Sequence, residues 1–537
     1  MVSLGVSMRW VLMGVAAFAA MAGLVDVAIA EPAPGKLPAE RPVIARETVE
    51  AAEPLQRTPE EWQAIALENL NAMRDLLIAH SPIGLPDGDA LQDAWLVAGY
   101  EEALALLPRV QDELGLLYVL RRYAIGFDDI HLSVHQDGPS LLTAWPGFVA
   151  ARRGTETVVA WRADEPAAGQ PPVGAVIRTC DGQSIEALID AGLFRFWRTP
   201  GVSRGYLQAT SRLFIDNASG FFPPPQRCQI LWDGAERTVE LVWTPVDLDD
   251  YSVGEAMMQA DGRQSATWGI TTPAPGVTWI GVPSFLDPYG EELPLELVDI
   301  VHTLSVSRDR YRRGGAIVVD LRGNGGGLVG GAYDLAEGLF GAAAGSRNRG
   351  LFMRTSTVFR ISQENVDYIS DRTQDRREFS DEQNALQPFA WMFMGALRNG
   401  EASLTLGPRA VRNTEGLTLQ RAGSPPPPAS DSAEIYVLVN ETCLSACLMF
   451  LDTAAFMPGV TIIGGVTGAD GALTWAREVA LPEPGMWISL PMVERRGPAR
   501  GAGEAYAPDI AYPGVWRDED VRAWVMDLVT RGETARR

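Results

Sequence analysis

The sequence is poor in basic residues, and lysine is almost absent. It holds 68 Asp and Glu against 45 Lys and Arg, which gives a formal net charge of -23 at pH 7 over 537 residues. Lys36 is the only lysine, and it lies in a Pro-rich stretch. Because binding to phosphate backbones needs a dense positive surface, this composition argues against a nucleic-acid partner.

Long apolar runs are also scarce. One run, from Trp10 to Val25, follows Arg9 and precedes an A-x-A signal at residues 28–30. This pattern predicts a secretory leader at residues 1–30, cleaved after Ala30. The alternative is an uncleaved N-terminal anchor, but the run is short for a membrane span. No later segment has the length and apolarity to cross a bilayer, so we expect a periplasmic or secreted protein with no stable membrane span after leader cleavage.

Cysteine is limited to four residues, which in an exported chain are compatible with disulfides. Cys180 and Cys228 fall in one expected domain, and Cys443 and Cys447 flank Ser445. Pairing within each set is the simplest of three connectivities. A bridge between Cys443 and Cys447 would brace the turn around Ser445. The alternative is that the cysteines pack as small apolar residues.

Ser445 lies where a buried-strand pattern changes to a helical one, within the run Glu434–Phe456. A serine at such a junction projects into open space, close to the unpaired N–H groups and the positive dipole end of the helix. Both features favour a developing negative charge, so Ser445 is a candidate nucleophile. The alternative is a serine that only caps the helix.

A glycine-rich turn follows a second buried strand. The apolar run Ala316–Leu321 leads into RGNGGG at residues 322–327, and a helical stretch comes next. Glycines let backbone N–H groups approach a ligand closely. Neither the P-loop pattern nor G-x-G-x-x-G can be aligned here with its other requirements. An oxyanion hole fits better, with Gly326, Gly327 and the N–H of Ala446 as donors.

Together the two segments resemble the tail-specific, or C-terminal-processing, serine peptidases and their tricorn-core relatives. The family's D-x-R-x-N-x-G-G matches residues 320–327, and its N-x-x-S-A-S-A-S-E lies on residues 440–448 with the nucleophile at Ser445. Its G-E-x-T-x-G-K-G lies on residues 464–471. Where the Ser-Lys members keep a lysine base, this chain has Asp470, and composition therefore excludes a Ser-Lys dyad.

Histidine is the obvious remaining base at neutral pH, and the chain has four. The resemblance to the tricorn-like branch implies a D-x-H motif in the N-terminal region, which residues 129–131 match, so we expect His131 to be the base. His80 and His302 lie in helical patterns that favour structural or surface roles. A metal pair of His131 and His135 is disfavoured, because a strand separates residues i and i+4 too far for one ion. We predict no metal and no cofactor.

The acidic residue that would orient His131 is less well defined. Relatives carry a glutamate just before G-V-x-P-D, and the corresponding stretch here is GAGEAYAPDI, with Glu504 two residues nearer to Pro508 than the pattern requires. Glu504 is the predicted acid, with Asp470 and Asp129 as alternatives.

The remaining patterns suggest how the chain is organised. Amphipathic helices precede His131, and short strands follow it. The segment from Pro171 to Gly192 resembles half of a PDZ domain, a fold that binds peptides at a sheet edge. The alternative is that this domain serves only as a spacer or lid. Strands that alternate with helices favour an α/β core of the ClpP/crotonase-like spiral type. The expected parts are a leader (1–30), a flexible lead-in (31–58), a helical cap domain (59–141), a PDZ-like β-rich domain (142–246) and a catalytic core (247–537) with an insertion at about 346–432.

The sequence thus predicts an exported serine peptidase that cleaves peptides or unfolded proteins through an acyl-enzyme. Two alternatives remain open at this stage. One is a non-catalytic relative that binds a peptide or a lipophilic ligand, and the other is an acyl hydrolase (esterase) on the same fold. The sequence leaves the natural substrate and the oligomeric state undetermined.

Overall fold

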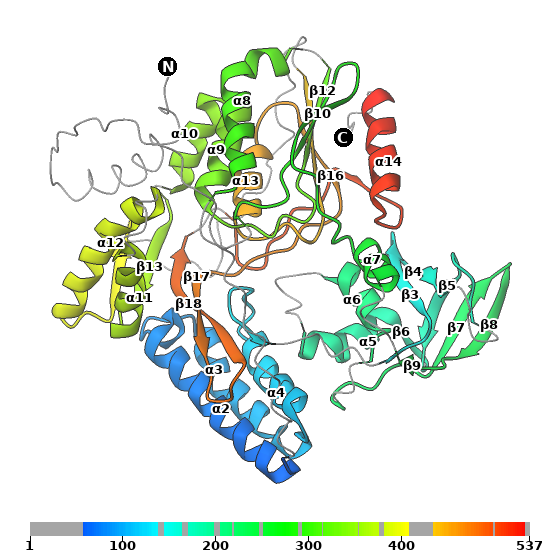
Figure 1. Ribbon diagram of the computed structural model, residues 1–537, viewed down its shortest axis with the longest axis horizontal. Coiled ribbons are helices and arrows are strands. Elements are labelled where there is room, and N and C mark those ends of the chain that lie inside the picture. The colour runs from blue at the N-terminus through cyan, green and yellow to red at the C-terminus, as the bar shows by residue number, and fades with distance from the viewer. Residues whose placement is uncertain are drawn as a thin grey trace, which may run out of the picture.

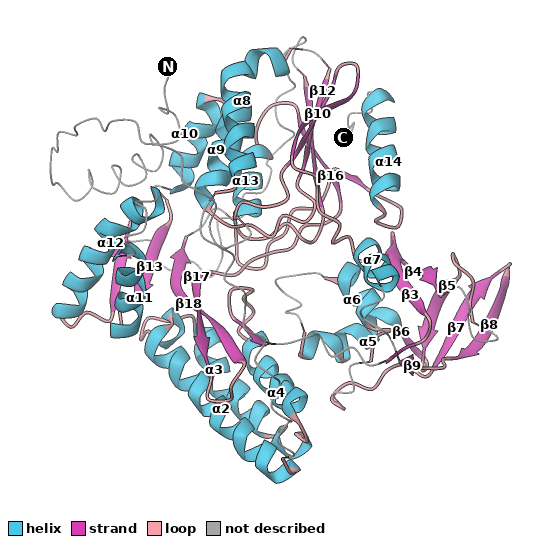
Figure 2. Ribbon diagram, viewed as in Figure 1, coloured by secondary structure: helices cyan, strands magenta, loops and turns pink. Residues whose placement is uncertain are grey.

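The computed structural model shows a mixed α/β protein (Figures 1 and 2). The leader expected at 1–30 and nearly all of the lead-in at 31–58 lie outside the described residues, as do parts of the insertion expected at 346–432. The structure describes residues 57–137, 144–163, 170–197, 205–216, 220–245, 251–287, 293–313, 315–352, 354–374, 381–407, 433–497 and 500–531.

A six-stranded sheet forms the centre, in the order β10-β11-β12-β15-β16-β19. The pairs from β11 to β19 are parallel, and β10 joins as an antiparallel edge strand. Carboxyl ends of parallel strands meet at one edge of a sheet, which is where α/β proteins build their sites. The strands are β10 (Gly269–Ala274), β11 (Val277–Gly281), β12 (Ala316–Asp320), β15 (Glu434–Val439), β16 (Val460–Gly464) and β19 (Ile510–Ala511).

Helices cover both faces of this sheet (Figure 1). Ile317 and Val319 of β12 pack toward one group of helices, whereas Val318 between them packs toward α14 on the opposite face. Burial on both faces explains why these strands are continuously apolar. The first group comprises α8 (Leu295–Tyr311), α9 (Val329–Phe340), α10 (Ala342–Phe352) and α13 (Ala446–Ala454), and α14 is Asp518–Arg531.

The predicted N-terminal helices are present, and they share a core with a late segment of the chain. The first helix begins with a capping box formed by Thr58 and Glu61, and Pro59 occupies its first helical position. Their buried residues form one cluster with Leu473 and Ile488 of a second sheet, so the cap is not self-contained. The elements are α2 (Pro59–His80), η1 (Pro82–Gly84), α3 (Ala90–Leu104), η2 (Leu107–Arg109) and α4 (Glu113–Ile125).

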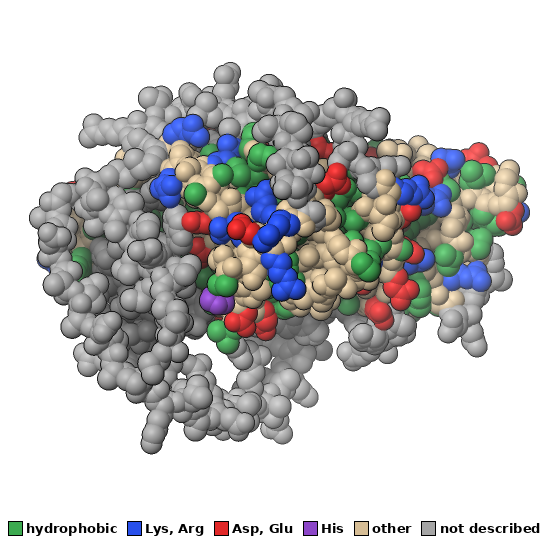
Figure 3. All heavy atoms as spheres, turned by 90° about the horizontal axis from the view of Figure 1, so that it is seen from above, with side chains coloured by type: hydrophobic (Ala, Val, Ile, Leu, Met, Phe, Trp, Pro, Cys, Tyr) green, Lys and Arg blue, Asp and Glu red, His purple; other side chains and the backbone are tan. Residues whose placement is uncertain are grey.

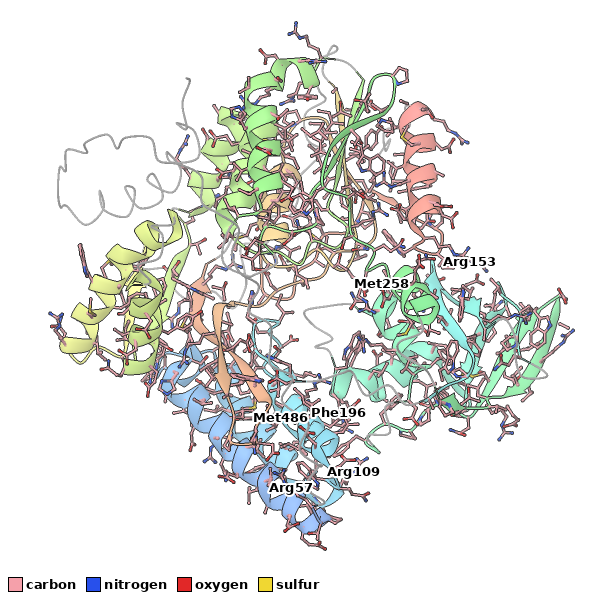
Figure 4. All side chains as sticks on the ribbon, viewed as in Figure 1. Arg57, Arg109, Arg153, Phe196, Met258 and Met486 are labelled. Carbon is pink, nitrogen blue, oxygen red and sulfur yellow. A yellow bond between two sulfur atoms is a disulfide. The ribbon has the colours of Figure 1, made fainter. Side chains whose placement is uncertain are left out.

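That second sheet runs in the order β1-β18-β13-β14, with β17 also paired to β18. The long hairpin of β17 and β18 reaches from the centre of the molecule to the N-terminal helices, where Met486 is labelled (Figure 4). The described part of the expected insertion is folded, because α11 and α12 pack on β13 and β14. The bounds are β1 (Ser133–Gln136), β13 (Ser356–Arg360), α11 (Gln363–Gln374), α12 (Asp381–Arg398), β14 (Ser403–Leu406), β17 (Leu473–Ala480) and β18 (Met486–Arg496).

The β-rich segment forms a third sheet, in the order β3-β4-β5-β7-β8 with β6 beside β5. A two-residue hairpin turn joins β7 to β8: Asp233 and Gly234 both have positive φ, as such a turn requires. Cys180 is bonded to Cys228 across β5 and β7. The elements are β2 (Ala144–Trp145), β3 (Phe148–Arg153), β4 (Glu156–Arg162), β5 (Val176–Cys180), β6 (Gln183–Ser184), α5 (Ile185–Ala191), η3 (Leu193–Arg195), α6 (Tyr206–Arg212), β7 (Arg227–Trp232), β8 (Ala235–Glu240), β9 (Thr244–Pro245) and α7 (Tyr251–Ala260).

The α/β class is therefore confirmed, whereas the spiral type of the core, the PDZ likeness and the domain boundaries stay predictions. On the face seen in Figure 3, acidic and basic side chains lie interspersed. Within the described ranges, no helix has both the length and the apolarity of a membrane span. The two disulfides favour a compartment outside the reducing cytoplasm.

Removing the Cys180–Cys228 bridge should destabilise the β-rich segment without touching the candidate site. The bridge closes a chain segment of 48 residues, so a chain-entropy estimate gives a loss of about 4 kcal/mol in the free energy of unfolding for C180A/C228A. Urea unfolding followed by tryptophan fluorescence measures this loss. An unchanged midpoint would contradict the expectation.

Candidate active site

Ser445 occupies the junction between β15 and α13 in a strained backbone conformation. Its φ is 50° and its ψ is -119°, a region that residues with a Cβ atom seldom adopt and that is found mainly at functional sites. Ser445 holds the N-cap position of α13, yet its side chain makes no capping hydrogen bond. The structure therefore disfavours the interpretation of Ser445 as a helix cap.

The hydroxyl of Ser445 instead faces His131. The Nε2 atom of His131 lies 3.3 Å from the Oγ atom of Ser445, although the two residues are 314 positions apart in the chain. The Nδ1 atom of His131 lies 3.0 Å from Oδ1 of Asp129. Because an ionised carboxylate can only accept, Nδ1 carries the proton in this arrangement and Nε2 presents its lone pair to the serine.

Asp129 accepts three hydrogen bonds, two of them from His131. Its Oδ1 also accepts from the backbone N–H of His131 (2.9 Å), and its Oδ2 accepts from the N–H of Leu473 (2.8 Å) at the start of β17. Asp129 is fully buried. A single carboxylate thus fixes the imidazole and anchors the N-terminal loop to the C-terminal part of the chain.

The path of the chain explains how the front of the sequence reaches the core. After α4, residues 126–132 form a loop, and β1 then pairs antiparallel with β18, with Val134 opposite Ile488. Leu132 and Val134 are buried in the cluster shared with β17 and β18. A side chain on Gly471 would place a Cβ atom 2.0 Å from Oδ2 of Asp129, so only glycine allows this approach.

The glycine-rich turn lies directly against the nucleophile turn. The N–H of Gly323 donates to Oγ1 of Thr442 (2.9 Å), which joins the two turns. Asn324 is buried, and its amide donates to the carbonyl of Val282 (2.9 Å). A Cβ atom on Gly326 would lie 2.8 Å from that of Ser445, so this position needs glycine too.

The three predicted oxyanion donors are not equivalent. The N–H of Gly326 donates to Oδ1 of Asn324 (2.9 Å) and is therefore occupied. Among the hydrogen bonds of the described residues, the N–H groups of Gly327 and Ala446 donate to none. Gly327 and Ala446 thus remain available as donors, while Gly326 supplies close packing and holds the turn.

A buried arginine, Arg322, supports the glycine-rich turn through ion pairs with two aspartates. Arg322 donates from Nε and Nη2 to the two oxygens of Asp320, at 2.9 and 2.7 Å, and Nη2 also donates to Asp518 (2.8 Å) at the start of α14. Arg322 is 1% exposed and Asp320 is fully buried. This bidentate pair anchors the end of β12 to α14.

Asp470, at the position of the family lysine, belongs to a buried ion network. Arg500 donates to Oδ1 of Asp470 (2.6 Å) and to Oδ1 of Asp452 (3.2 Å) on α13, and Arg495 lies 3.5 Å from Oδ2 of Asp470. Burial alone would raise the pKa of Asp470, but the charges of Arg500 and Arg495 outweigh it and hold the pKa below its usual value.

Glu504, the predicted acid, has another partner. Its Oε2 accepts from the N–H of Gly501 (3.0 Å), while Asp129, one of the two sequence alternatives, holds Nδ1 of His131. The spacing of Asp129 and His131 could have identified Asp129 as the acid. An aspartate side chain readily accepts a hydrogen bond from the backbone N–H two residues later, and the resulting turn keeps the two residues together.

The remaining histidines lie away from this arrangement. His80 lies 3.3 Å from Glu364, and burial lowers its pKa. His135, on β1, lies 3.3 Å from Glu478. His302 lies in α8. Over the described ranges, no three His, Cys, Asp or Glu side chains gather as metal ligands would.

Sequence reasoning missed Glu441, which ties the nucleophile turn to the β-rich segment. Its buried carboxylate accepts from the N–H groups of Leu207 (3.1 Å) and Gln208 (2.7 Å) at the start of α6. No sequence pattern marks this contact, because the partners are backbone groups more than 230 positions away. The Cys443–Cys447 bridge, in contrast, is the pairing that the sequence favours.

Replacing Arg500 with methionine should destabilise the protein and reverse a pH trend. Loss of one partner from a buried ion pair costs about 3–5 kcal/mol. In the wild type the lowered pKa of Asp470 adds stability above about pH 4, which is lost as the pH falls further. Without Arg500, burial should raise that pKa, so the free energy of unfolding should increase as the pH falls from 7 to 4. Urea unfolding at pH 7, 5 and 4 measures both effects.

Arg153→Met is the matched control, since the Arg153 side chain, labelled in Figure 4, is 41% exposed and forms a surface pair with Glu156. Surface pairs contribute about 0–1 kcal/mol. Equal losses in the two variants would show that the Arg500 network contributes no more than a surface pair.

Comparison with known proteins places the fold. No protein-family model and no curated protein sequence matches the chain. Among solved structures, mature CPAF matches with a TM-score of 0.53 at 17% identity, over 89% of this chain and 99% of that chain. Mature CPAF complexed with lactacystin matches with a TM-score of 0.51 at 16% identity, over 88% and 100%.

A photosystem II D1 C-terminal processing protease also matches, at 14% identity over 85% of this chain and 96% of that chain, but its TM-score of 0.28 is too low to support an argument. At these identities the comparisons establish the fold alone. In its overall fold, the chain is therefore similar to mature CPAF.

Proposed function

We propose that this protein is a serine peptidase, exported to the periplasm or secreted, which cleaves peptides or unfolded proteins through an acyl-enzyme. The observation that carries the proposal is the contact of His131 Nε2 with Ser445 Oγ, combined with the contact of Nδ1 with Asp129. A nucleophile, a base in reach of it and a carboxylate that orients the base are the three parts that acyl transfer requires.

The first half of the proposed reaction acylates Ser445. Oγ attacks the carbonyl carbon of the scissile peptide while His131 Nε2 takes its proton. Asp129 keeps the imidazole in the correct tautomer and stabilises the imidazolium. The carbonyl oxygen becomes an oxyanion, for which the N–H groups of Gly327 and Ala446 are the proposed donors; loss of one such donor in other enzymes costs about 100- to 1000-fold in kcat.

The second half releases the acyl group. His131 first returns its proton to the departing amine, which breaks the C–N bond and leaves an ester on Ser445. Water then attacks the ester, with His131 again taking the proton, and the acid product leaves as Oγ regains a hydrogen. No lysine is needed at any step. Asp470 has no proton to exchange in this scheme, since Arg500 and Arg495 keep it ionised.

The site geometry weighs against the alternative of a non-catalytic binding protein. The case for a non-catalytic protein was that the family lysine is missing and that Glu504 is displaced from its expected position. In the proposed mechanism, His131 replaces the lysine as the base and Asp129 replaces Glu504 as the orienting carboxylate. The same machinery would also hydrolyse an ester, so the choice of a peptide substrate rests on the resemblance of the motifs at residues 320–327 and 440–448 to those of the tail-specific peptidases. Lactacystin, found bound in a CPAF structure, is a reasonable first probe of this chain.

Ser445→Ala should abolish activity while leaving the fold intact. Replacement removes one oxygen and no helix-capping hydrogen bond, so the free energy of unfolding should change by less than about 0.5 kcal/mol. Hydrolysis of unfolded casein should fall by about 10⁶-fold, the scale seen when a nucleophile is removed elsewhere. Ser403→Ala on β14 is the control and should keep full activity. Casein turnover by Ser445→Ala would overturn the assignment of the nucleophile.

A pair of neutral substitutions separates the two candidate acids. Asp129→Asn removes the charge that holds Nδ1 and should lower kcat by about 10⁴-fold, whereas Glu504→Gln keeps an acceptor for the Gly501 N–H and should change kcat less than about threefold. Steady-state hydrolysis of a fluorogenic peptide measures both. The reverse order of effects would restore Glu504 as the orienting acid.

A further inference from the structure

A disulfide spans the candidate nucleophile. Cys443 lies two residues before Ser445, Cys447 lies two residues after it, and their sulfur atoms are bonded. Cys443 belongs to the loop that follows β15, and Cys447 belongs to the first turn of α13. The bridge therefore closes a small ring that contains Ser445 and joins the end of a strand to the start of a helix.

The strand side of this ring is fixed to its surroundings. The N–H of Cys443 donates to the carbonyl of Asn440 (3.0 Å), and the amide of Asn440 donates to the carbonyl of Gly262 (2.7 Å). On the helix side, the N–H of Cys447 donates to the carbonyl of Leu444 (3.0 Å), within the ring itself. Both cysteines are fully buried in the core that surrounds α13.

Between these fixed ends Ser445 holds a conformation that it would not adopt alone. A positive φ is unfavourable for a residue with a Cβ atom, so the surroundings must impose it. Gly326 packs on one side, at a distance that leaves no room for a side chain. The disulfide is the only covalent restraint within this turn, and two unbonded sulfur atoms need a wider separation than a bonded pair.

We infer that oxidation of Cys443 and Cys447 completes the active site, so that the protein becomes a hydrolase only after this disulfide has formed. The inference rests on the proposed function and adds a redox condition to it. The two thiols are oxidised by a low-molecular-weight or protein disulfide: one sulfur displaces a thiol to give a mixed disulfide, and the second sulfur displaces the other thiol. The products are the Cys443–Cys447 bond and two reduced thiols.

The consequence is a restriction by compartment. In a reducing cytoplasm the thiols persist, and the turn is free to relax toward an ordinary φ, which moves Oγ away from His131. In an oxidising compartment the ring closes and holds Oγ at His131. A hydrolase built this way is inactive where it is synthesised and active where it is exported.

The second disulfide supplies a matched control within the same chain. Cys180 and Cys228 are also fully buried and bonded, but they join β5 to β7 in the β-rich sheet and flank no site residue. A variant that lacks this pair keeps the turn cysteines as its only thiols. Its redox state therefore reports on Cys443 and Cys447 alone.

The test measures the rate at which a fluorophosphonate labels Ser445 in the full chain. C180A/C228A is unfolded in urea with dithiothreitol, then refolded with or without oxidised glutathione. Intact mass counts the thiols, and circular dichroism checks the fold. We expect the oxidised form to be labelled at the wild-type rate and the reduced form about 100-fold more slowly, as a displacement of about 1 Å produces in other enzymes.

A second variant keeps the test decisive if reduction impairs refolding. C443S/C447S places a small hydroxyl side chain at each of the two positions, cannot form the bridge, and needs no reductant. It should fold with a cooperative thermal transition and lose labelling by a similar factor, with the loss in kcat rather than in KM. C180A/C228A, purified oxidised, should keep its kcat.

The outcomes separate this inference from the proposed function. Equal labelling rates for the reduced and oxidised forms, or a wild-type rate for C443S/C447S, would overturn the redox condition and leave the peptidase proposal standing. Absence of labelling in the oxidised wild type would overturn both.

Discussion

The carboxylate of Asp129 is the contact on which the rest of the site depends. It accepts from the imidazole and the backbone of His131 and from the N–H of Leu473, so one buried group orients the base and binds the front of the chain to its rear. The helices before His131 also share a hydrophobic core with the hairpin of β17 and β18. Without that shared core, a histidine 314 positions from Ser445 could not be held within reach of its hydroxyl.

The site also shows how a chain with one lysine can use this fold. Asp470 takes the position of the family's lysine, and Arg500 links it to Asp452 on the helix that follows the nucleophile. A buried ion network thus forms at the position where the motif resemblance expects a lysine, and the proposed proton transfer falls to His131 instead. In the proposed mechanism, structural support and proton transfer are carried by separate groups, unlike in a Ser-Lys dyad.

The features that could be predicted from the sequence are those that depend on residues close together in the chain. The apolar strand before Ser445, the glycines of residues 325–327 and the D-x-H spacing each reflect a local geometric need. The resemblance to the family favoured Glu504 as the orienting acid, although its spacing to Pro508 differed from the family pattern, whereas in the structure Asp129 contacts the imidazole. Which glycine N–H stays available depended on the side chain of Asn324. The identity of the orienting acid, the available glycine N–H and the shared core of the N-terminal helices all depend on tertiary contacts. Local sequence patterns therefore do not predict them.

The central claim is that Ser445 and His131 act together, with Asp129 behind them. A crystal structure of the protein after reaction with a fluorophosphonate tests it most directly. The account predicts a phosphorus atom bonded to Oγ of Ser445, a phosphonyl oxygen within hydrogen-bond distance of the N–H groups of Gly327 and Ala446, and His131 still held by Asp129. An adduct on a different side chain, or an imidazole turned away from the phosphonylated serine, would contradict it.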